Sequence, residues 1–349
     1  MKQQLSLIIL ILIGIFYACS GPMYEPGMIS GEVVFTPQGN TIDQQDGFLT
    51  MEEGIDIYYF SEGKGEPVLM IHGGPGYPFG ASWKGLDSLV NDFRFIYYHQ
   101  RGCGKSTHPV DTYASKNYFL NLTDLQANLG LETQIKDIER IRIILGEDRI
   151  TLIGHSFGGF MASLYAIEYP QRVKSLILVS PADVIKMPSG NGGLYDQVEK
   201  RLPVEMKKEY HQYLDKFFDY KNIFKKSEKE LSELNGEFNK YFYAAYDISD
   251  EQLESSTQSI NIGGWHMHAL FFSMGKKHDY SEAFKAIQAP VLVIHGEHDI
   301  MPLESVTVYN KLIEGSTLNV IEGAGHFSFN EQPVVFGDIA GEFLKGEIE

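Results

Sequence analysis

A serine lies where the sequence predicts a sharp turn between a buried strand and a helix. The segment Gly154-His155-Ser156-Phe157-Gly158 follows the apolar run 150–153, and a helical pattern extends over 157–169. In a G-x-S-x-G turn of this kind the serine backbone is strained and its hydroxyl is lifted above the end of the strand, where side chains in place of the glycines would clash. Ser156 is therefore the candidate nucleophile. The alternative is a serine that only caps the helix.

A serine hydroxyl becomes a good nucleophile when a base takes its proton, and that base needs a carboxylate to orient it. Two polar segments downstream follow strand-like runs: the run 291–294 leads to Glu297 and Asp299, and the run 318–321 leads through a glycine-rich loop to His326. Because parallel strands end at the same edge of a sheet, these side chains can meet Ser156 there. His326 is the candidate base, with Asp299 as its carboxylate and Glu297 as the competing carboxylate.

Acyl-transfer chemistry also needs N–H groups that stabilise a developing oxyanion. One such donor is the N–H of the residue after the nucleophile, Phe157. The second is expected from the loop His72-Gly73-Gly74-Pro75-Gly76, which follows the apolar run 68–71. Its glycines allow the backbone to approach a substrate closely, and Gly74 is the candidate donor. Such a loop alone would equally suit phosphate binding or a simple chain reversal.

The elements that must position these residues alternate between strand-like and helix-like patterns. Strands are expected at 33–35, 55–60, 68–71, 95–98, 150–153, 175–179, 291–294 and 318–321, and helices at 131–145, 157–169, 303–312 and 333–344. The first two strands are predicted to be antiparallel edge strands. This alternation predicts an α/β fold with a mostly parallel sheet covered by helices on both faces.

The alternation stops over 184–283, which begins with a glycine-rich stretch and continues with helical, Lys- and Glu-rich sequence carrying many aromatic residues. We expect an inserted helical cap there, with most of its aromatic residues packing between helices. The predicted organisation is a signal peptide over 1–18, a tether over 19–30, a first part of the core over 31–183, the cap, and a second part of the core over 284–349.

These motifs together resemble the α/β-hydrolase superfamily and, within it, the proline iminopeptidase-like serine peptidases. The resemblance rests on His72-Gly73-Gly74-Pro75-Gly76, on Gln100-Arg101-Gly102-Cys103-Gly104-Lys105-Ser106, on Asp137-Ile138-Glu139-Arg140, on the serine turn and on the two final polar segments. It implies an α/β-hydrolase fold and an aminopeptidase that releases N-terminal proline or another small or apolar residue from short peptides through an acyl-enzyme.

The same resemblance implies specific residue roles. It assigns Ser156, Asp299 and His326 to the catalytic triad, in preference to Glu297, and Gly74 and Phe157 to the oxyanion hole. The chain departs from the family pattern at His99, where an aspartate is usual, and at the serine turn itself, which is the general hydrolase form.

Members of the family bind the amino group of the substrate with carboxylates of the cap, where this chain has acidic residues such as Glu237 and Asp247. The substrate-binding residues are unknown from the sequence. A carboxylesterase or lactonase with the same triad is the alternative activity, and a binding module without catalysis is the alternative from another class.

Composition narrows the range of partners. The formal net charge is −17, with 29 Lys and Arg against 46 Asp and Glu, and such a charge repels nucleic-acid phosphates. The two cysteines, Cys19 and Cys103, rule out a disulfide scaffold, and Cys103 is expected to be structural. His266 with His268 and His295 with His298 lack a metal-binding motif, so we expect no metal and no cofactor.

The first residues have the layout of an export signal. One lysine precedes an apolar stretch over 5–18 that is short for a membrane span, and Ser20 and Gly21 follow Cys19. The segment around Cys19 resembles a bacterial lipoprotein signal, in which the cysteine becomes the lipidated first residue; the alternatives are an ordinary cleaved signal and an uncleaved anchor. We therefore expect an exported protein of the bacterial cell envelope, anchored to the membrane through Cys19 and facing the periplasm or the exterior.

Overall fold

The computed structural model describes residues 21–29, 31–37, 39, 41–42, 45–246 and 261–346. The predicted signal peptide, Cys19 and Asp247 lie outside the described residues. Within them, eight strands form one sheet in the order β1-β2-β4-β3-β5-β6-β9-β10. The strands are β1 (Asp46–Glu52), β2 (Ile55–Gly63), β3 (Glu66–Ile71), β4 (Phe93–Tyr98), β5 (Ile150–His155), β6 (Val173–Val179), β9 (Val291–Gly296) and β10 (Thr317–Ile321).

Only the β1 end of the sheet is antiparallel. β2 pairs antiparallel with both β1 and β4, and the other neighbouring strands pair in parallel. The parallel strands therefore end along one edge of the sheet, where the candidate residues were expected. The predicted α/β class with a mostly parallel sheet is confirmed.

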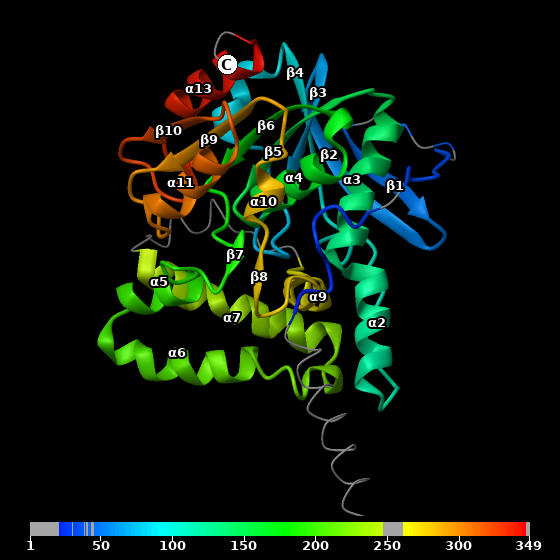
Figure 1. Ribbon diagram of the computed structural model, residues 1–349, viewed down its shortest axis with the longest axis vertical. Helices are drawn as coiled ribbons and strands as arrows, with labels where there is room; N and C mark the ends of the chain where they lie inside the picture. The colour runs from blue at the N-terminus through cyan, green and yellow to red at the C-terminus, as the bar shows by residue number, and fades with distance from the viewer. Residues whose placement is uncertain are drawn as a thin grey trace, which may run out of the picture.

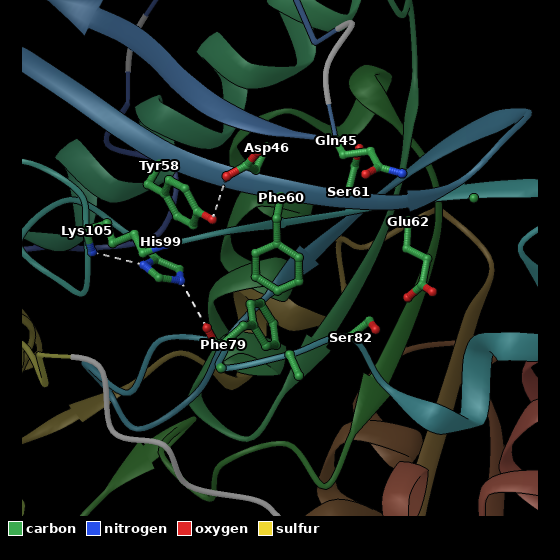
Figure 2. Close-up of a pocket in the computed structure, with 13 residues that line it drawn as sticks. Gln45, Asp46, Tyr58, Phe60, Ser61, Glu62, Phe79, Ser82, His99 and Lys105 are labelled. Carbon is green, nitrogen blue, oxygen red and sulfur yellow. Dashed lines mark hydrogen bonds between the residues drawn. The ribbon is translucent and has the colours of Figure 1, made fainter.

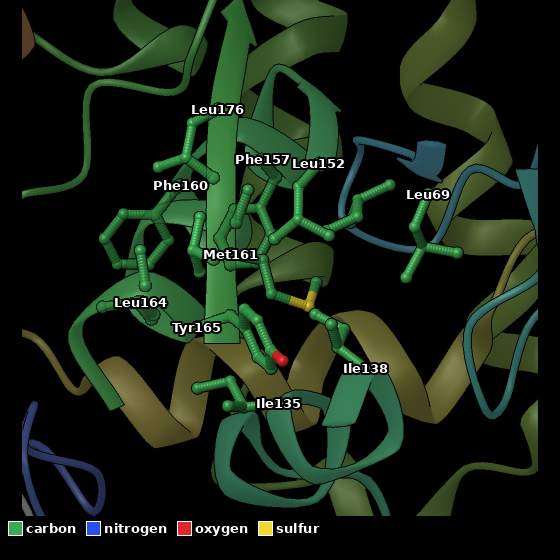
Figure 3. Packing of buried hydrophobic residues seen from close by; sticks show 14 of the residues in the cluster. Leu69, Ile135, Ile138, Leu152, Phe157, Phe160, Met161, Leu164, Tyr165 and Leu176 are labelled. Carbon is green, nitrogen blue, oxygen red and sulfur yellow. The ribbon is translucent and has the colours of Figure 1, made fainter. Parts of the chain in front are cut away.

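Each parallel strand contributes side chains to two separate hydrophobic clusters because successive side chains point to opposite faces. In β3, Leu69 and Ile71 belong to one cluster, whereas Val68 and Met70 belong to the other. The first cluster lies under α3 (Leu131–Leu145), α4 (Phe157–Glu168), α10 (Ser281–Phe284) and α11 (Leu303–Leu312), and Figure 3 shows part of it. The second is covered by η1 (Lys84–Leu89), α12 (Ser328–Glu331) and α13 (Pro333–Leu344).

A helical layer stands apart from the sheet (Figure 1). It contains α5 (Leu194–Arg201), α6 (Val204–Phe217), η3 (Ile223–Lys225), α7 (Glu228–Tyr246) and α9 (Gly264–Met274), and α2 (Tyr118–Leu129) packs against α9. A short antiparallel ribbon of β7 (Lys186–Met187) and β8 (His278–Asp279) joins this layer to the core. The expected inserted helical cap is therefore present, and "cap" below means residues 186–279.

One predicted strand is wrong. Residues 33–35 form no strand, and the antiparallel partner of β2 is β1, which the sequence reasoning did not identify. Val34 is fully exposed. A run of three apolar residues that has no neighbouring strand leaves its backbone N–H and C=O groups without strand partners, so it does not form a stable strand. In contrast, β1 pairs with β2 and buries Leu49 and Met51 against the core.

The segment 22–29, expected to be part of a tether, is packed onto the folded body. Tyr24 is buried, its hydroxyl donates to Glu168 Oε1 at 2.6 Å, and two further N–H groups of the segment donate to the same carboxylate. The Tyr24 N–H donates to Ser273 O at 3.0 Å, and the Tyr280 hydroxyl donates to Tyr24 O at 2.6 Å. This segment therefore links α4 of the core to α9 of the cap and to Tyr280, which follows the cap directly.

Across the described part of the chain, the helices are too short or too polar to span a lipid bilayer.

Candidate active site

Ser156 occupies the turn between β5 and α4 in a conformation that few residues other than glycine adopt. Its φ is 53° and its ψ is −120°. Its backbone is held on both sides, because its N–H donates to Val179 O at 2.9 Å and its carbonyl accepts from Ala182 N at 3.0 Å. These hydrogen bonds hold Ser156 in the strained conformation. Backbone strain that is held in place in this way is typical of a functional position.

The glycines of the turn are required by close backbone contacts. A Cβ at Gly154 would lie 2.4 Å from Gly158 O, and a Cβ at Gly158 would lie 2.1 Å from Ile71 O. Both contacts are far shorter than any side chain tolerates. β3, β5 and the first turn of α4 can therefore approach one another only with glycine at both positions, and this approach places Ser156 at the carboxyl edge of the sheet.

His326 and Asp299 form a buried pair beside this turn. His326 Nδ1 lies 3.0 Å from both Oδ1 and Oδ2 of Asp299, and the two residues are 6% and 3% exposed. Asp299 Oδ1 also accepts the Met301 N–H at 2.9 Å, and His295 Nδ1 lies 3.5 Å from Oδ2. A carboxylate with these partners holds the imidazole so that Nδ1 carries the proton and Nε2 is free to accept one.

The partners keep Asp299 ionised. Burial alone raises the pKa of Asp299, but the electrostatic interaction and hydrogen bond with His326, together with His295 and the Met301 N–H, outweigh burial and lower that pKa to about 2. Burial, together with the neighbouring His326, lowers the pKa of His155 to about 3. His155 is thus neutral, and its Nε2 bonds to His326 O at 2.8 Å.

Glu297, the competing carboxylate, has another role. Its side chain is 47% exposed, and its Oε2 accepts the Gly323 N–H at 3.0 Å. It braces the loop before His326 and leaves the imidazole to Asp299.

Two residues that the sequence reasoning missed hold the histidine loop. Tyr246, at the end of α7 in the cap, accepts a hydrogen bond from the His326 N–H. Glu331 accepts from the N–H groups of Gly325 and Phe327, the latter at 3.3 Å. No local pattern marks Tyr246, because it lies 80 positions before His326 in the chain. Glu331 follows His326 closely, but its neighbours in the sequence do not indicate which N–H groups it binds.

The expected oxyanion donors lie on either side of a close contact between two loops. A Cβ at Gly73 would lie 2.8 Å from Ser156 Cβ and 3.4 Å from Phe157 N, so Gly73 touches the serine turn directly. Within the described residues, the N–H groups of Gly74 and Phe157 donate no hydrogen bond. Phe157 is the first residue of α4, where an N–H has no partner inside the helix. Both donors are therefore available next to Ser156.

In the described chain, no hydrogen bond joins Ser156 Oγ to His326 Nε2. Such bonds commonly tighten only when substrate binds, so the arrangement is compatible with general-base catalysis.

The loop after β4 supports the loop of Gly73 and Gly74. Gln100 N–H donates to His72 Nε2 at 3.1 Å, and Gln100 Nε2 donates to His72 O at 2.8 Å. Arg101 donates to Asp137 through Nε at 2.9 Å and Nη2 at 2.8 Å. These bonds anchor the Arg101 loop to α3, and Cys103 in the same loop is a buried free thiol.

The hollow shown in Figure 2 is not lined by Ser156, Asp299 or His326. It has a volume of about 520 Å³ and is lined by residues of β2 and of the loops around Phe79 and His99. His99 Nε2 bonds to Phe79 O at 3.0 Å and Nδ1 accepts the Lys105 N–H at 3.1 Å. Burial lowers the pKa of His99 to about 4. His99 is thus a neutral side chain that braces two loops.

The sequence offered two histidine pairs, at which we expected no metal: His266 with His268, and His295 with His298. His266 and His268 are buried in α9, His295 lies beside Asp299, and His298 is exposed. Among the residues that the structure describes, three His, Cys, Asp or Glu side chains nowhere cluster as they would around a metal ion.

Comparison with known proteins agrees with this geometry. The sequence profile of the alpha/beta hydrolase fold matches residues 66–333. The chain belongs to the α/β-hydrolase family. It is 27% identical to a proline iminopeptidase of Heyndrickxia coagulans, over 86% of this chain and 98% of that protein.

Other similar proteins have different activities. A 2-hydroxy-6-oxo-2,4-heptadienoate hydrolase of Pseudomonas putida is 24% identical, over 88% of this α/β hydrolase and 99% of the relative. A solved thermophilic esterase from Thermogutta terrifontis superposes with a TM-score of 0.58 at 22% identity, over 88% of this chain and all of the esterase. The resemblance to proline iminopeptidase-like proteins is confirmed, and the structural likeness supports the fold.

Proposed function

We propose that this α/β hydrolase is a serine hydrolase that works through an acyl-enzyme. The observation that carries the proposal is the strained Ser156 beside two unused N–H donors, on the same sheet edge as the His326–Asp299 pair. A nucleophile, a base held in one tautomer and an oxyanion site are the parts that acyl transfer requires.

In the first half-reaction, Ser156 Oγ attacks the substrate carbonyl while His326 Nε2 takes the hydroxyl proton. The oxyanion accepts hydrogen bonds from the N–H groups of Gly74 and Phe157, and Asp299 stabilises the imidazolium. When the tetrahedral intermediate collapses, His326 returns its proton to the leaving nitrogen or oxygen and an acyl-Ser156 ester remains. Water then attacks this ester, with His326 again as the base, and the acid and free Ser156 are released.

We propose aminopeptidase activity as the first candidate. The support is the similarity to proline iminopeptidases over nearly the whole chain, in the Heyndrickxia protein and in a second one from Saccharolobus solfataricus that is 25% identical. The expected substrates are short peptides with an N-terminal proline or another small or apolar residue.

An esterase or lactonase is the second candidate, and the state of the cap carboxylates favours it. Glu237 is exposed on α7. The inward-facing Glu228 is occupied, because its oxygens accept from Gly264 N at 2.8 Å and Trp265 N at 2.6 Å and pair with His108 Nδ1 at 2.9 Å. A buried ammonium group needs an available partner, whereas an ester of an uncharged acid does not.

The two candidates are separated by measuring kcat/KM of the full-length protein on proline, alanine and leucine arylamides, each free and N-acetylated, and on p-nitrophenyl butyrate. An aminopeptidase cleaves the free arylamides, and its kcat/KM is at least tenfold lower on the N-acetylated arylamides. An esterase turns over only the butyrate. Ser156→Ala is the control for both, and a substrate turned over equally by this variant would contradict the serine mechanism.

We also propose that the protein is exported and lipidated at Cys19. The packed segment 22–29 supports this, because it would hold the body within a few residues of the anchor. The expected result is that the wild-type protein stays with the membrane fraction and Cys19→Ser does not, whereas the neighbouring Ser20→Ala behaves like the wild type. Membrane association of Cys19→Ser would overturn the proposal.

A further inference from the structure

The aromatic cluster of the cap touches each of the three loops that carry the triad partners and the oxyanion donors. Tyr77 follows Gly74, Met301 follows Asp299 and Phe327 follows His326, and all three pack into the cluster. Its other members come mainly from α5, α6, α7 and α9. The side of the substrate that faces away from Ser156 would therefore meet cap residues.

Several buried polar groups in and beside this cluster have no hydrogen-bond partner in the described chain, Tyr213, Asn235 and His268 among them. Tyr213 is 1% exposed and Asn235 is fully buried, and neither the Tyr213 hydroxyl nor Asn235 Oδ1 makes a hydrogen bond in the described chain. The orientation of the Asn235 amide is determined, because Nδ2 donates to Gly263 O at 2.8 Å and to Gly264 O at 3.2 Å. The unused atom of Asn235 is thus an acceptor. Buried polar groups nearly always have partners, so both atoms are exceptions that need an explanation.

Both groups lie close to Tyr77. The Tyr77 hydroxyl donates to the backbone carbonyl of Asn235 at 2.8 Å. Phe238 follows Asn235 by one turn of α7, and its ring centroid lies 6.3 Å from that of Tyr213. Burial raises the pKa of the Tyr213 phenol, and the nearby phenol of Tyr77 raises it further. Tyr213 is therefore a neutral hydroxyl, and it belongs to the same cluster as Tyr77.

Tyr77 itself is tied to the oxyanion loop. Its N–H donates to Gly73 O at 3.2 Å, and its ring lies 2.7 Å from where a Cβ of Gly74 would be. A group bound beside Tyr77 is thus near the acyl carbon that Gly74 would bind, rather than at the far end of the cap.

We propose that Tyr213 and Asn235 form a subsite for a hydrogen-bond donor, an amino or hydroxyl group, on the first carbons of the substrate's acyl part. The inference rests on the proposed serine-hydrolase function and names the substrate class of that site. Asn235 Oδ1 accepts from the donor, and the Tyr213 hydroxyl rotates to accept a second hydrogen bond or to donate one. Both atoms are shut off from solvent, so the cap must move away from Tyr77 when substrate enters.

The test uses three methyl esters of nearly equal size: those of alanine, lactic acid and propionic acid, which carry an amino group, a hydroxyl group or neither on the same carbon. Acid release by the full-length protein gives kcat/KM for each. The wild type is expected to prefer at least one donor-bearing ester over the propionate. Tyr213→Phe is expected to reduce that preference, the ratio of kcat/KM for the donor-bearing ester to that for the propionate, about two- to tenfold, which is the range for one neutral hydrogen bond.

Tyr98→Phe is the matched control, because the Tyr98 hydroxyl is also buried without a partner but belongs to the core of the sheet. It should leave all three rates unchanged. A wild type that prefers propionate, or a Tyr213→Phe variant whose three rates stay the same or fall together, would overturn the proposal. Loss of every activity in Ser156→Ala shows that the serine mechanism holds in either case, so the two failures are distinguishable.

Discussion

Replacing Asp299 by asparagine keeps the size of the side chain but removes the charge that faces His326. The two carboxylate oxygens lie 3.0 Å from His326 Nδ1. At a separation of about 3–4 Å and an effective dielectric constant of about 20, a carboxylate stabilises an imidazolium by about 4–5.5 kcal/mol. Because that charge exists only as the serine reacts, the loss falls on kcat and corresponds to a factor of about 10³–10⁴.

The amide would also disturb the tautomer. An asparagine can present its NH₂ group to Nδ1, and the imidazole proton then lies on Nε2, where it blocks proton transfer from Ser156. Both effects act in the same direction, so Asp299→Asn is expected to lower kcat by at least 10³ while KM changes little.

The assay is steady-state hydrolysis of the best ester or arylamide, with circular dichroism to show that the variant is folded. Glu297→Gln is the matched control, because this carboxylate lies two residues away, is half exposed, and contacts the exposed His298 and the loop before His326 rather than the His326 imidazole. The kcat of Glu297→Gln should stay within about threefold of the wild-type value. If Glu297→Gln lost more activity than Asp299→Asn, the assignment of the orienting carboxylate would be refuted.

Further outcomes follow from the same geometry. Ser156→Ala should lower kcat about 10⁴-fold or more and leave substrate binding intact; near-wild-type turnover would exclude the nucleophile. Gly73→Ala should lower kcat about 100-fold, because the new Cβ would lie 2.7 Å from His155 O and 2.8 Å from Ser156 Cβ, and unchanged kinetics would show that the loops can separate. Since the pKa of Asp299 is lowered from its usual value to about 2, this carboxylate should stabilise the fold above about pH 4 and lose that contribution as the pH falls toward 2; denaturant titrations in which the wild type and Asp299→Asn show the same pH dependence would contradict this. Tyr213→Phe should raise the free energy of unfolding by about 1 kcal/mol in denaturant titrations, because a buried hydroxyl without a partner is removed; a large destabilisation would reveal a hidden bond.

Several elements could be located from the sequence to the residue. The helix predicted over 131–145 coincides with α3, and Gly146 ends it with a φ of 73°. The helices over 303–312 and 333–344 coincide with α11 and α13, the latter with a proline in its first turn. Apolar spacing, a left-handed glycine and an N-terminal proline are local signals, because each acts within about one helical turn.

The edge of the sheet was harder to predict. β1 shows no clear alternation, and its pairing with β2 depends on the hairpin geometry and on the core beneath Leu49 and Met51. The run 33–35 has β-branched and aromatic residues, but no strand lies beside it. Strand formation is decided by neighbours, so a short apolar run is a weak signal.

The candidate catalytic residues were recognisable because each follows a strand in a short glycine-rich turn, and parallel strands bring such turns to one edge. Sequence order and strand periodicity thus sufficed to predict that Asp299 and His326 are neighbours, and they predict Ser156 at the same edge of the sheet. Some residues around them come from distant parts of the chain: Tyr246 of the cap holds the histidine loop, and other cap residues reach the oxyanion loop. Their positions depend on how the cap packs against the core, and packing between segments separated by many residues leaves no periodic mark in the chain. Local conformation follows from neighbouring residues, whereas the partners of a buried side chain are chosen by the whole folded structure.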